Sequence, residues 1–504
     1  MSKLLWGVLA APAFLLAGCG PVDVEQADGP VVAADGIDFR PCTLDSGRTG
    51  KGLQAQCGTL EVPEDRDNPA GRRIALHIAR ISPEEGMQSE PDPVFFLAGG
   101  PGQAATEVAA LVMPSLSEVA KSRDVYFIDQ RGTGKSNPLG CVDQDGEPLS
   151  FEDQNITSAA QIEQFASICL KGLEGRADPR FYSTGQAIDD LEAVRTALGV
   201  ARLNLVGGSY GTRVAQQYAA RYPAQTRSIV LDGVAPNDLV IGAEFAQTFQ
   251  RAIEAQSALC QADAVCAKRF PTDTVTQLRQ VIAELKRNPQ KVQYRDPATA
   301  EWRDESLPAE AVTGLAFAFS YSPEMASLLP VVIDEAANGR YQGLASLTRV
   351  ASQSMFGSIN RGMQWSVLCT EDADRKTDSR AADAGTLLGA ETAELFHVAC
   401  KVWPQGQVAK GFTQPLSTDV PALLLSGELD PVTPPAYAER VVAHLPKGRH
   451  LVARGRSHGT LGAGCMPNLL GQFIERADAA SLDVSCLDAL RPVPPFTSFN
   501  GWEP

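Results

Sequence analysis

Short runs of consecutive apolar residues, separated by stretches of helical pattern, constrain the fold of this chain more than any other feature. The runs are residues 94–97, 125–128, 203–206, 229–231, 422–425 and, more weakly, 450–453. A strand that is apolar at every position is buried on both faces, as in a parallel sheet covered by helices. Residues 74–81 alternate instead, as expected of a half-exposed strand. The sequence therefore predicts an α/β fold with a mostly parallel sheet flanked by helices.

This strand pattern stops at about residue 237 and resumes at Pro421. The intervening chain is mostly of helical pattern, as in residues 243–260 and 274–286. An insertion that interrupts a sheet and lets it continue afterwards is expected to form a lid. We therefore expect one core built from residues 42–236 and 406–504, with a helical lid formed by residues 237–405.

The first residues have the layout of an export signal. Lys3 precedes a short apolar run at residues 4–16, which ends in Leu-Ala-Gly-Cys at Cys19. Such a run is too short to anchor a protein by itself, and small residues before a cysteine resemble the lipobox of bacterial lipoproteins. We expect a signal peptide at residues 1–18, then lipidated Cys19 and a tether at residues 19–41. An ordinary secretory signal with an incidental Cys19 is the alternative.

This leader predicts an exported protein held in the bacterial envelope through its lipid alone. Gly20, rather than an aspartate, after the lipidated cysteine favours the outer membrane where the cell has one. No later window is apolar enough to cross a bilayer. The chain of 504 residues has a net charge of −16. Because such a chain repels phosphate backbones, we exclude nucleic acid as a partner.

The cysteines agree with export. There are eleven, so ten remain for disulfides if Cys19 carries lipid. Connectivity cannot be deduced from sequence, but the clustering of near neighbours suggests the hypothesis Cys42–Cys57, Cys141–Cys169, Cys260–Cys266, Cys369–Cys400 and Cys465–Cys486. No C-x-x-C pair or other metal-ligand spacing occurs, so no metal and no organic cofactor are expected.

The strongest local motif is Gly-Gly-Ser-Tyr-Gly at residues 207–211. It matches G-x-S-x-G, with a buried strand before it and a helical stretch after it. Small residues are needed on both sides because the strand turns sharply into the helix, which leaves the serine exposed on strained backbone. The motif predicts Ser209 as a nucleophile. A glycine-rich turn whose serine only caps the helix is the alternative.

A serine nucleophile requires a base and an acid, which follow it in the order Asp or Glu, then His. Of the five histidines, only His458 lies in a polar, glycine-flanked loop after a late strand. Asp430 follows the preceding strand and stands before Pro431, at the edge of the sheet where ligands bind. We assign His458 as general base and acid and Asp430 as the carboxylate that orients it, with Glu428 as the rival acid.

Backbone donors for an oxyanion are expected in the glycine-rich segment after residues 94–97. The N–H groups of Gly100 (or Gly99) and Tyr210 would form this hole. A turn without function is the alternative. Residues 129–136 end like a phosphate-binding loop, but Asp129 stands where the first glycine is required, so a nucleotide site is a weak hypothesis.

Together, the motifs GGPG, DQRGTGKS, GGSYGT, SGELDPVTPP and RSHG resemble those of the prolyl iminopeptidase and tripeptidyl aminopeptidase family of α/β-hydrolases. The likeness extends from about Cys42 to Cys486 and is greatest to the secreted tripeptidyl aminopeptidases. It implies removal of residues from free peptide N-termini through an acyl-enzyme, without a cofactor. The family's usual histidine before Gly-Gly-Pro-Gly is Ala98 here, which weakens a strict iminopeptidase assignment.

An exopeptidase of this kind must bind the substrate's ammonium group, for which a carboxylate is the natural partner. Residues 365–372 resemble the family's Cys-x-acid segment, so Glu371, with Asp372 in reserve, is the expected anchor. A solvated acid beside a disulfide is the alternative.

Three functions remain open. They are an aminopeptidase, a carboxylesterase or other acyl hydrolase on the same triad, and an inactive peptide-binding envelope lipoprotein. The intact Ser209, Asp430 and His458 argue against the last. The sequence does not give the number of residues removed, the side-chain preference or the oligomeric state.

Overall fold

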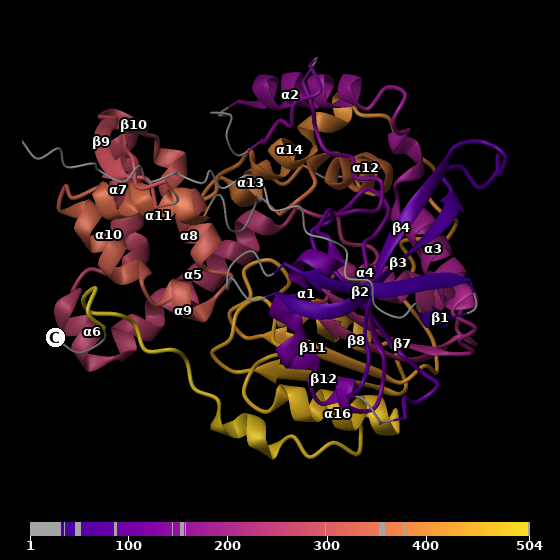
Figure 1. The fold of residues 1–504 in the computed structure, drawn as a ribbon. Helices are drawn as coiled ribbons and strands as arrows, with labels where there is room; N and C mark the ends of the chain where they lie inside the picture. The colour runs from indigo at the N-terminus through magenta and orange to yellow at the C-terminus, as the bar shows by residue number, and fades with distance from the viewer. Residues whose placement is uncertain are drawn as a thin grey trace, which may run out of the picture.

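The computed structural model describes residues 32–501, apart from residues 35, 46–51, 85–87, 144, 152–155, 157, 298, 352–357 and 376–377. The predicted signal peptide and Cys19 lie outside the described residues. The centre of the fold is a ten-stranded sheet with the strand order β1-β2-β3-β4-β6-β5-β7-β8-β11-β12 (Figure 1).

The strands from β6 to β12 are parallel, and β1 to β4 form an antiparallel extension that joins β6. The predicted mostly parallel sheet is therefore confirmed. The bounds of the sheet strands are β1 Val32–Ala34, β2 Ile37–Leu44, β3 Leu53–Pro63, β4 Arg73–Ile81, β5 Val94–Leu97, β6 Val125–Ile128, β7 Leu203–Gly208, β8 Thr226–Asp232, β11 Ala422–Gly427 and β12 Gly448–Ala453.

Helices cover both faces of the sheet because its central strands are apolar on both sides. Phe95 and Leu97 of β5 pack into one buried cluster, whereas Val94 and Phe96 pack into another on the opposite face. The first cluster includes residues of α3, α4 and α15, and the second includes residues of α1 and α16. The helices of these two core segments are α1 Ala105–Val112, α2 Ala159–Gly172, α3 Thr184–Ala197, α4 Tyr210–Arg221, α15 Pro435–Val442 and α16 Met466–Arg476, with the 3-10 turns η1 Met113–Leu116, η2 Val119–Lys121, η3 Pro179–Phe181 and η7 Ser485–Ala489.

Between β8 and β11 the chain is mostly helical, as predicted. Its elements are α5 Phe245–Ala262, α6 Ala264–Arg269, α7 Thr274–Arg287, α8 Ala309–Phe319, α9 Pro323–Ala326, α10 Leu329–Ala337, α11 Gln342–Ala351, α12 Arg361–Glu371, α13 Arg380–Asp383 and α14 Thr392–His397, with η5 Ala373–Arg375, η6 Val398–Lys401 and a hairpin of β9 Gln290–Arg295 and β10 Trp302–Leu307. The hairpin was not predicted, because its strands are short and rich in charged residues.

The elements from α5 to α11, residues 245–351, form a lobe to one side of the sheet (Figure 1). We call it the α5–α11 lobe. Its helices bury a separate hydrophobic cluster, which includes Phe249, Leu278, Val312 and Phe319 together with one residue of the core, Val432. Helix α12 is different, since Met363, Trp365 and Leu368 belong to the cluster that packs against the sheet.

The chain enters the sheet earlier than predicted. Strand β1 begins at Val32 and β2 at Ile37, so the predicted tether over residues 19–41 extends too far. Ile37 and Phe39 are both buried, and one polar residue separates them. In a strand this spacing places both side chains on the same face, where they join the main core.

Five disulfides join Cys42 to Cys57, Cys141 to Cys169, Cys260 to Cys266, Cys369 to Cys400 and Cys465 to Cys486. This is the pairing of near neighbours that the sequence suggested. Disulfides in this number are typical of an exported protein. None of the helices in the described part of the chain has the length and apolar character needed to span a bilayer.

Candidate active site

Ser209 occupies the sharp turn between β7 and α4. Its φ of +54° lies in the left-handed region, which a residue with a side chain rarely adopts. The turn is fixed by two backbone hydrogen bonds, from Ser209 N–H to the Asp232 carbonyl at 2.8 Å and from Thr212 N–H to the Ser209 carbonyl at 2.9 Å. Strained backbone of this kind persists only where surrounding structure holds it, and it presents the side chain at the end of the strand.

The glycines of the motif are required by close packing around this turn. A Cβ on Gly207 would lie 2.4 Å from the Gly211 carbonyl oxygen, and one on Gly211 would lie 2.2 Å from the Leu97 carbonyl oxygen. Both distances are far below van der Waals contact. Helix α4 can therefore begin directly against β5 and β7 only because these two positions lack side chains.

Asp430 and His458 form a direct pair. Asp430 follows β11, His458 follows β12, and His458 Nδ1 lies 2.8 Å from Asp430 Oδ2. The buried Asp430 carboxylate also accepts hydrogen bonds from the N–H groups of Val432, at 2.9 Å, and Thr433, at 2.8 Å. The Thr433 hydroxyl donates to Asp430 Oδ2 at 2.7 Å and lies 3.1 Å from His458 Nδ1.

These contacts shift both pKa values. Burial raises the pKa of Asp430, but His458 and the hydrogen bonds from the 432–433 backbone outweigh burial and lower it. Burial lowers the pKa of His458, but the attraction of Asp430 and then Asp232 outweighs burial and raises it. The pair therefore favours an ionised carboxylate beside an imidazole that readily holds a proton.

The rival acid, Glu428, lies elsewhere. Its side chain is exposed and accepts a hydrogen bond from Gly455 N–H at 2.7 Å. Of the two acids considered, the structure brings only Asp430 to the histidine.

The loop that carries His458 is anchored to β8 and to the α5–α11 lobe. Asp232, at the end of β8, accepts hydrogen bonds from Thr460 N–H, at 2.7 Å, and Leu461 N–H, at 3.0 Å. His458 N–H donates to the Tyr321 carbonyl at 3.1 Å, and the two rings meet edge to face with centroids 5.1 Å apart.

Ser209 and His458, which follow β7 and β12, are both close in space to the end of β8. Ser209 is bonded to Asp232, and a Cβ on the next residue, Gly233, would lie 3.1 Å from His458 Cε1. In the described part of the chain no hydrogen bond joins the Ser209 hydroxyl to His458. Catalytic hydrogen bonds are often long in unliganded enzymes and tighten only when substrate binds.

The predicted oxyanion donors flank Ser209. A Cβ on Gly99 would lie 3.1 Å from Ser209 Cβ, so the loop after β5 touches the serine. Gly100 and Gly102 in this loop have φ values of +108° and +104°, which favour glycine. Tyr210 is the first residue of α4, where backbone N–H groups have no acceptor within the helix.

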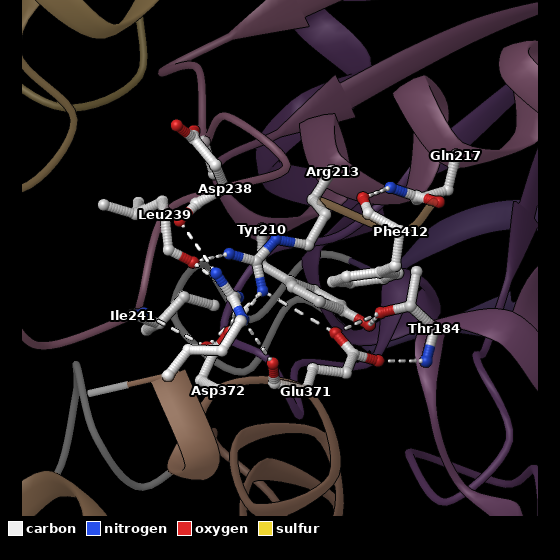
Figure 2. Close-up of polar contacts among 12 residues, drawn as sticks. Thr184, Tyr210, Arg213, Gln217, Asp238, Leu239, Ile241, Glu371, Asp372 and Phe412 are labelled. Atoms are coloured by element: carbon white, nitrogen blue, oxygen red, sulfur yellow. Dashed lines mark hydrogen bonds and ion pairs between the residues drawn. The ribbon is translucent and has the colours of Figure 1, made fainter. Parts of the chain in front are cut away.

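Glu371 and Asp372, the predicted ammonium anchor, are buried in a network around Arg213 of α4 (Figure 2). Arg213 Nη1 lies 3.6 Å from Glu371 Oε2 and 3.3 Å from Asp372 Oδ1, and Arg375 Nη2 lies 2.6 Å from Asp372 Oδ1. Glu371 also accepts hydrogen bonds from Thr184 N–H, at 2.6 Å, and from the Thr184 hydroxyl, at 3.0 Å. Neither carboxylate is exposed.

Burial is the main reason that the pKa of Glu371 rises to about 7, and Asp372 adds to this rise. Arg213 and the hydrogen bonds from Thr184 act in the opposite direction. The network therefore combines two acids with two arginines, and one of these arginines, Arg213, lies one helical turn beyond Ser209.

Sequence reasoning missed several residues of this region. Thr433 could have been found, because Asp-x-x-Thr in the quoted SGELDPVTPP segment is a spacing at which a carboxylate accepts bonds from the following backbone. Tyr321 and Arg213 gave no local signal, since their partners are distant in the sequence.

The loop that resembles a phosphate-binding motif is filled by its own acid. Asp129 accepts hydrogen bonds from Thr106 N–H at 2.9 Å and from Lys135 N–H at 3.1 Å. These donors are therefore already paired with a carboxylate. Among the described residues, no group of three or more histidine, cysteine or acidic side chains is placed to hold a metal ion.

Comparison with known proteins agrees with this geometry. A family model described as "alpha/beta hydrolase fold" matches residues 92–461, which is most of the chain. The protein belongs to the α/β-hydrolase family. The matched residues begin just before β5 and end just after His458, so they include Ser209, Asp430 and the insertion between them.

Relatives of this α/β-hydrolase carry peptidase names. It is 28% identical over 487 residues to "Serine protease Hip1" of Mycobacterium tuberculosis, a match covering 90% of this chain and 91% of that protein. It is also 28% identical over 226 residues to "Tripeptidyl aminopeptidase" of Streptomyces coelicolor, covering 42% of this chain and 41% of that protein. A solved proline iminopeptidase from Mycobacterium smegmatis is 17% identical with a TM-score of 0.36, covering 84% of this chain and all of that one. The chain is an α/β-hydrolase that is similar to these two proteins with peptidase names.

Proposed function

We propose that this protein is a serine exopeptidase that removes short peptides, tripeptides or similar, from free N-termini. The observation that carries the proposal is the 2.8 Å Asp430–His458 pair beside a serine held at positive φ. The peptidase names of its relatives favour a peptide bond as the target. A carboxylesterase or other acyl hydrolase is the second candidate, because the same residues would cleave either bond.

In the proposed reaction, the Ser209 hydroxyl attacks the carbonyl carbon of the scissile bond while His458 accepts its proton. Asp430 holds the imidazole and stabilises the imidazolium that forms. The N–H groups of Gly100 and Tyr210 donate to the developing oxyanion. His458 then gives its proton to the leaving amine, and the acyl-enzyme forms. Water attacks this ester by the same steps in reverse, which releases the peptide acid and restores Ser209.

The deciding experiment compares a free tripeptidyl-anilide with its N-acetylated twin, using residues 20–504 and Ser209→Ala as control. We expect cleavage of the free amine alone and no activity in the control. If both anilides resist while an aryl ester is cleaved through Ser209, the protein is an esterase.

The pair of acids provides a matched test of the triad. Asp430→Asn should lower kcat by about 10⁴-fold, because the imidazole loses the partner that fixes its orientation and tautomer. Glu428→Gln, at an exposed position, should leave kcat within about twofold. Equal losses in the two variants would contradict the assignment of Asp430.

The pH profile follows from the shift at His458. Only the neutral imidazole accepts the Ser209 proton, so kcat/KM should fall as the pH drops through the pKa of His458. Because Asp430 raises that pKa, we expect the acidic limb above the usual histidine value of about 6.5.

Glu371, with Asp372 in reserve, stays a prediction as the ammonium anchor. An anchor acts on binding, so Glu371→Gln should raise KM for the free tripeptidyl-anilide. Because the carboxylate is buried and paired with Thr184 and Arg213, an ammonium group would have to displace one of these partners.

We further propose that the predicted lid, residues 237–405, covers the site through its α5–α11 lobe, and that Cys19 is lipidated in the bacterial envelope. The five disulfides favour export. Labelled palmitate should be incorporated into the intact chain, and this incorporation should be lost in Cys19→Ser. If the intact chain and Cys19→Ser are both secreted without label, the signal is an ordinary secretory one.

A further inference from the structure

Helix α12 lies in the inserted interval but packs against the core that carries Ser209. Its residues Met363, Trp365 and Leu368 share a buried cluster with Leu97 and Tyr210. A Cβ on Gly362 would lie 2.2 Å from the Leu139 carbonyl oxygen, so the helix backbone rests directly on the core. The Cys369–Cys400 disulfide holds its last turn.

The beginning of α12 is joined to the loop that carries the first predicted oxyanion donor. Asn360 N–H donates to the Gly102 carbonyl at 2.9 Å, and Ile359 forms an antiparallel bridge with Gln103. The approach is close, since a Cβ on Gly102 would lie 2.6 Å from the Asn360 carbonyl oxygen.

The end of α12 is joined to the second predicted donor. Gln130 Nε2 donates to the Tyr210 hydroxyl at 3.2 Å, and that hydroxyl lies 2.7 Å from Thr184 Oγ1. The Thr184 hydroxyl donates in turn to Glu371 Oε2 at 3.0 Å. Figure 2 shows Tyr210, Thr184 and Glu371 of this chain. Since each hydroxyl has one proton, the chain runs in one direction, from Gln130 through Tyr210 and Thr184 to the Glu371 carboxylate.

We propose that α12 is a brace that holds the two oxyanion donors in their relative positions, with Thr184 and Glu371 as positioning residues. The inference rests on the proposed roles of Gly100 and Tyr210. One end of a single rigid helix fixes the loop of Gly100, and the other end fixes the side chain of the residue that follows Ser209. Donors aligned before the reaction stabilise the oxyanion without reorganisation, which is why their placement matters to the rate.

Tyr210→Phe tests the brace because it removes the hydroxyl but leaves the backbone N–H donor. Tyr218→Phe is the matched control, because Tyr218 lies on the same helix and its hydroxyl donates to Glu192 of α3, at 2.7 Å, instead of to the chain that ends at Glu371. We expect Tyr210→Phe to lower kcat for 4-nitrophenyl acetate about tenfold with KM nearly unchanged. Inhibition by phenylboronic acid, whose serine adduct has an oxyanion-like oxygen, should weaken by the same factor. Tyr218→Phe should change neither quantity.

Thr184 provides the second arm. Thr184→Val keeps the shape but breaks the chain to Glu371 and should reproduce the tenfold loss, whereas Thr184→Ser keeps the hydroxyl and should restore kcat. Equal kcat in all variants would overturn the brace, and so would equal losses in Tyr210→Phe and Tyr218→Phe. A merely structural role predicts lower thermal stability without the parallel loss of boronate affinity.

This test is separate from the test of the proposed function. The aryl ester has no amino terminus, so the brace is decided even if the protein proves to be an esterase. Ester hydrolysis that survives Ser209→Ala would overturn the brace together with the triad. If Glu371→Gln changes only the KM for the free peptide and leaves kcat for the aryl ester unaltered, Glu371 belongs to the ammonium anchor and not to the brace.

Discussion

The α5–α11 lobe and helix α12 are inserted in the same interval of the chain, but they pack into different cores. The lobe buries Phe249 and Phe319 among its own helices. Helix α12 buries Met363 and Trp365 against the sheet. Position in the sequence alone would place both in one lid.

This difference separates two tasks. The lobe contacts the site through Tyr321, which meets the histidine loop, and through Val432 of the loop after Asp430. Helix α12 contacts the loops that frame the nucleophile through Asn360 and Glu371. We infer that changes in the lobe act on access to the site, whereas changes in α12 act on the reacting geometry.

The largest expected effect compares two buried aromatic residues. Trp365 of α12 packs edge to face on Trp403 at 5.3 Å, and Phe249 of the lobe on Phe317 at 5.4 Å. Replacement of either by alanine should cost about 3–5 kcal/mol of stability. Trp365→Ala should lower the unfolding free energy of the sheet and reduce ester hydrolysis. Phe249→Ala should lose hydrogen-exchange protection in residues 245–351 alone and keep ester hydrolysis. Loss of protection throughout the chain in both variants would contradict two cores.

Two helical glycines should respond with opposite signs. Gly362→Ala in α12 brings a Cβ within 2.2 Å of the Leu139 carbonyl oxygen, so the midpoint of urea unfolding should fall, by about 2 kcal/mol in free energy. Gly314→Ala in α8 meets open space and should stabilise the protein by about 0.5–1 kcal/mol. A destabilised Gly314→Ala would show that the lobe helix is constrained in a way that its surroundings do not indicate.

The pH dependence of stability should also differ between the two regions. The pKa of Glu371 is about 7 in the folded protein, above its usual 4.5, so the stability it contributes is present below 4.5 and lost as pH rises to 7. The stability of Glu371→Gln relative to the natural protein should therefore increase over that interval, by about 3 kcal/mol. Urea unfolding at pH 4.5 and pH 8 measures this difference, and a constant difference would contradict the raised pKa.

The smallest effect concerns the cap of lobe helix α7. Asp273 accepts a hydrogen bond from Thr276 N–H at 3.0 Å. Burial raises the pKa of Asp273, but the hydrogen bonds from Thr276 and the neighbouring backbone together outweigh burial and lower it. This contribution to stability is therefore lost as pH falls, the reverse of Glu371. Asp273→Ala should cost about 1 kcal/mol at pH 7 and leave kcat for an aryl ester unchanged. A lower kcat would show that the lobe also shapes the reacting geometry.

Much of the core was predictable because its signals are local. Strands buried on both faces give continuous apolar runs, so residues 94–97, 125–128 and 203–206 were found with almost their observed bounds. The turn at Ser209 requires glycines on both sides, and Asp430 stands before Pro431. Each of these constraints involves residues close together in the sequence.

The brace and the buried acids were not predictable, because they depend on pairs far apart in the chain. Glu371 after a cysteine has the pattern of an exposed acid at a helix end. Its burial depends on Thr184 and Arg213, which an earlier part of the chain contributes. Arg213 also pairs with the buried neighbour Asp372. The packing of α12 depends on Gly102 meeting Asn360, which no periodicity records.

The order of the disulfides has a consequence for how the chain matures. Every pair joins consecutive cysteines, with sequence separations from 6 to 31 residues, and no pair encloses another cysteine. For a chain that crosses a membrane N-terminus first, each thiol meets its native partner as the next one to emerge. An oxidase that simply joins neighbours in order of arrival would then produce the native set, without an isomerase to correct it. Cys19 is the exception, since it emerges before all of these pairs, and attachment of a lipid to its sulfur through a thioether would remove it from the sequence of pairings before Cys42 arrives.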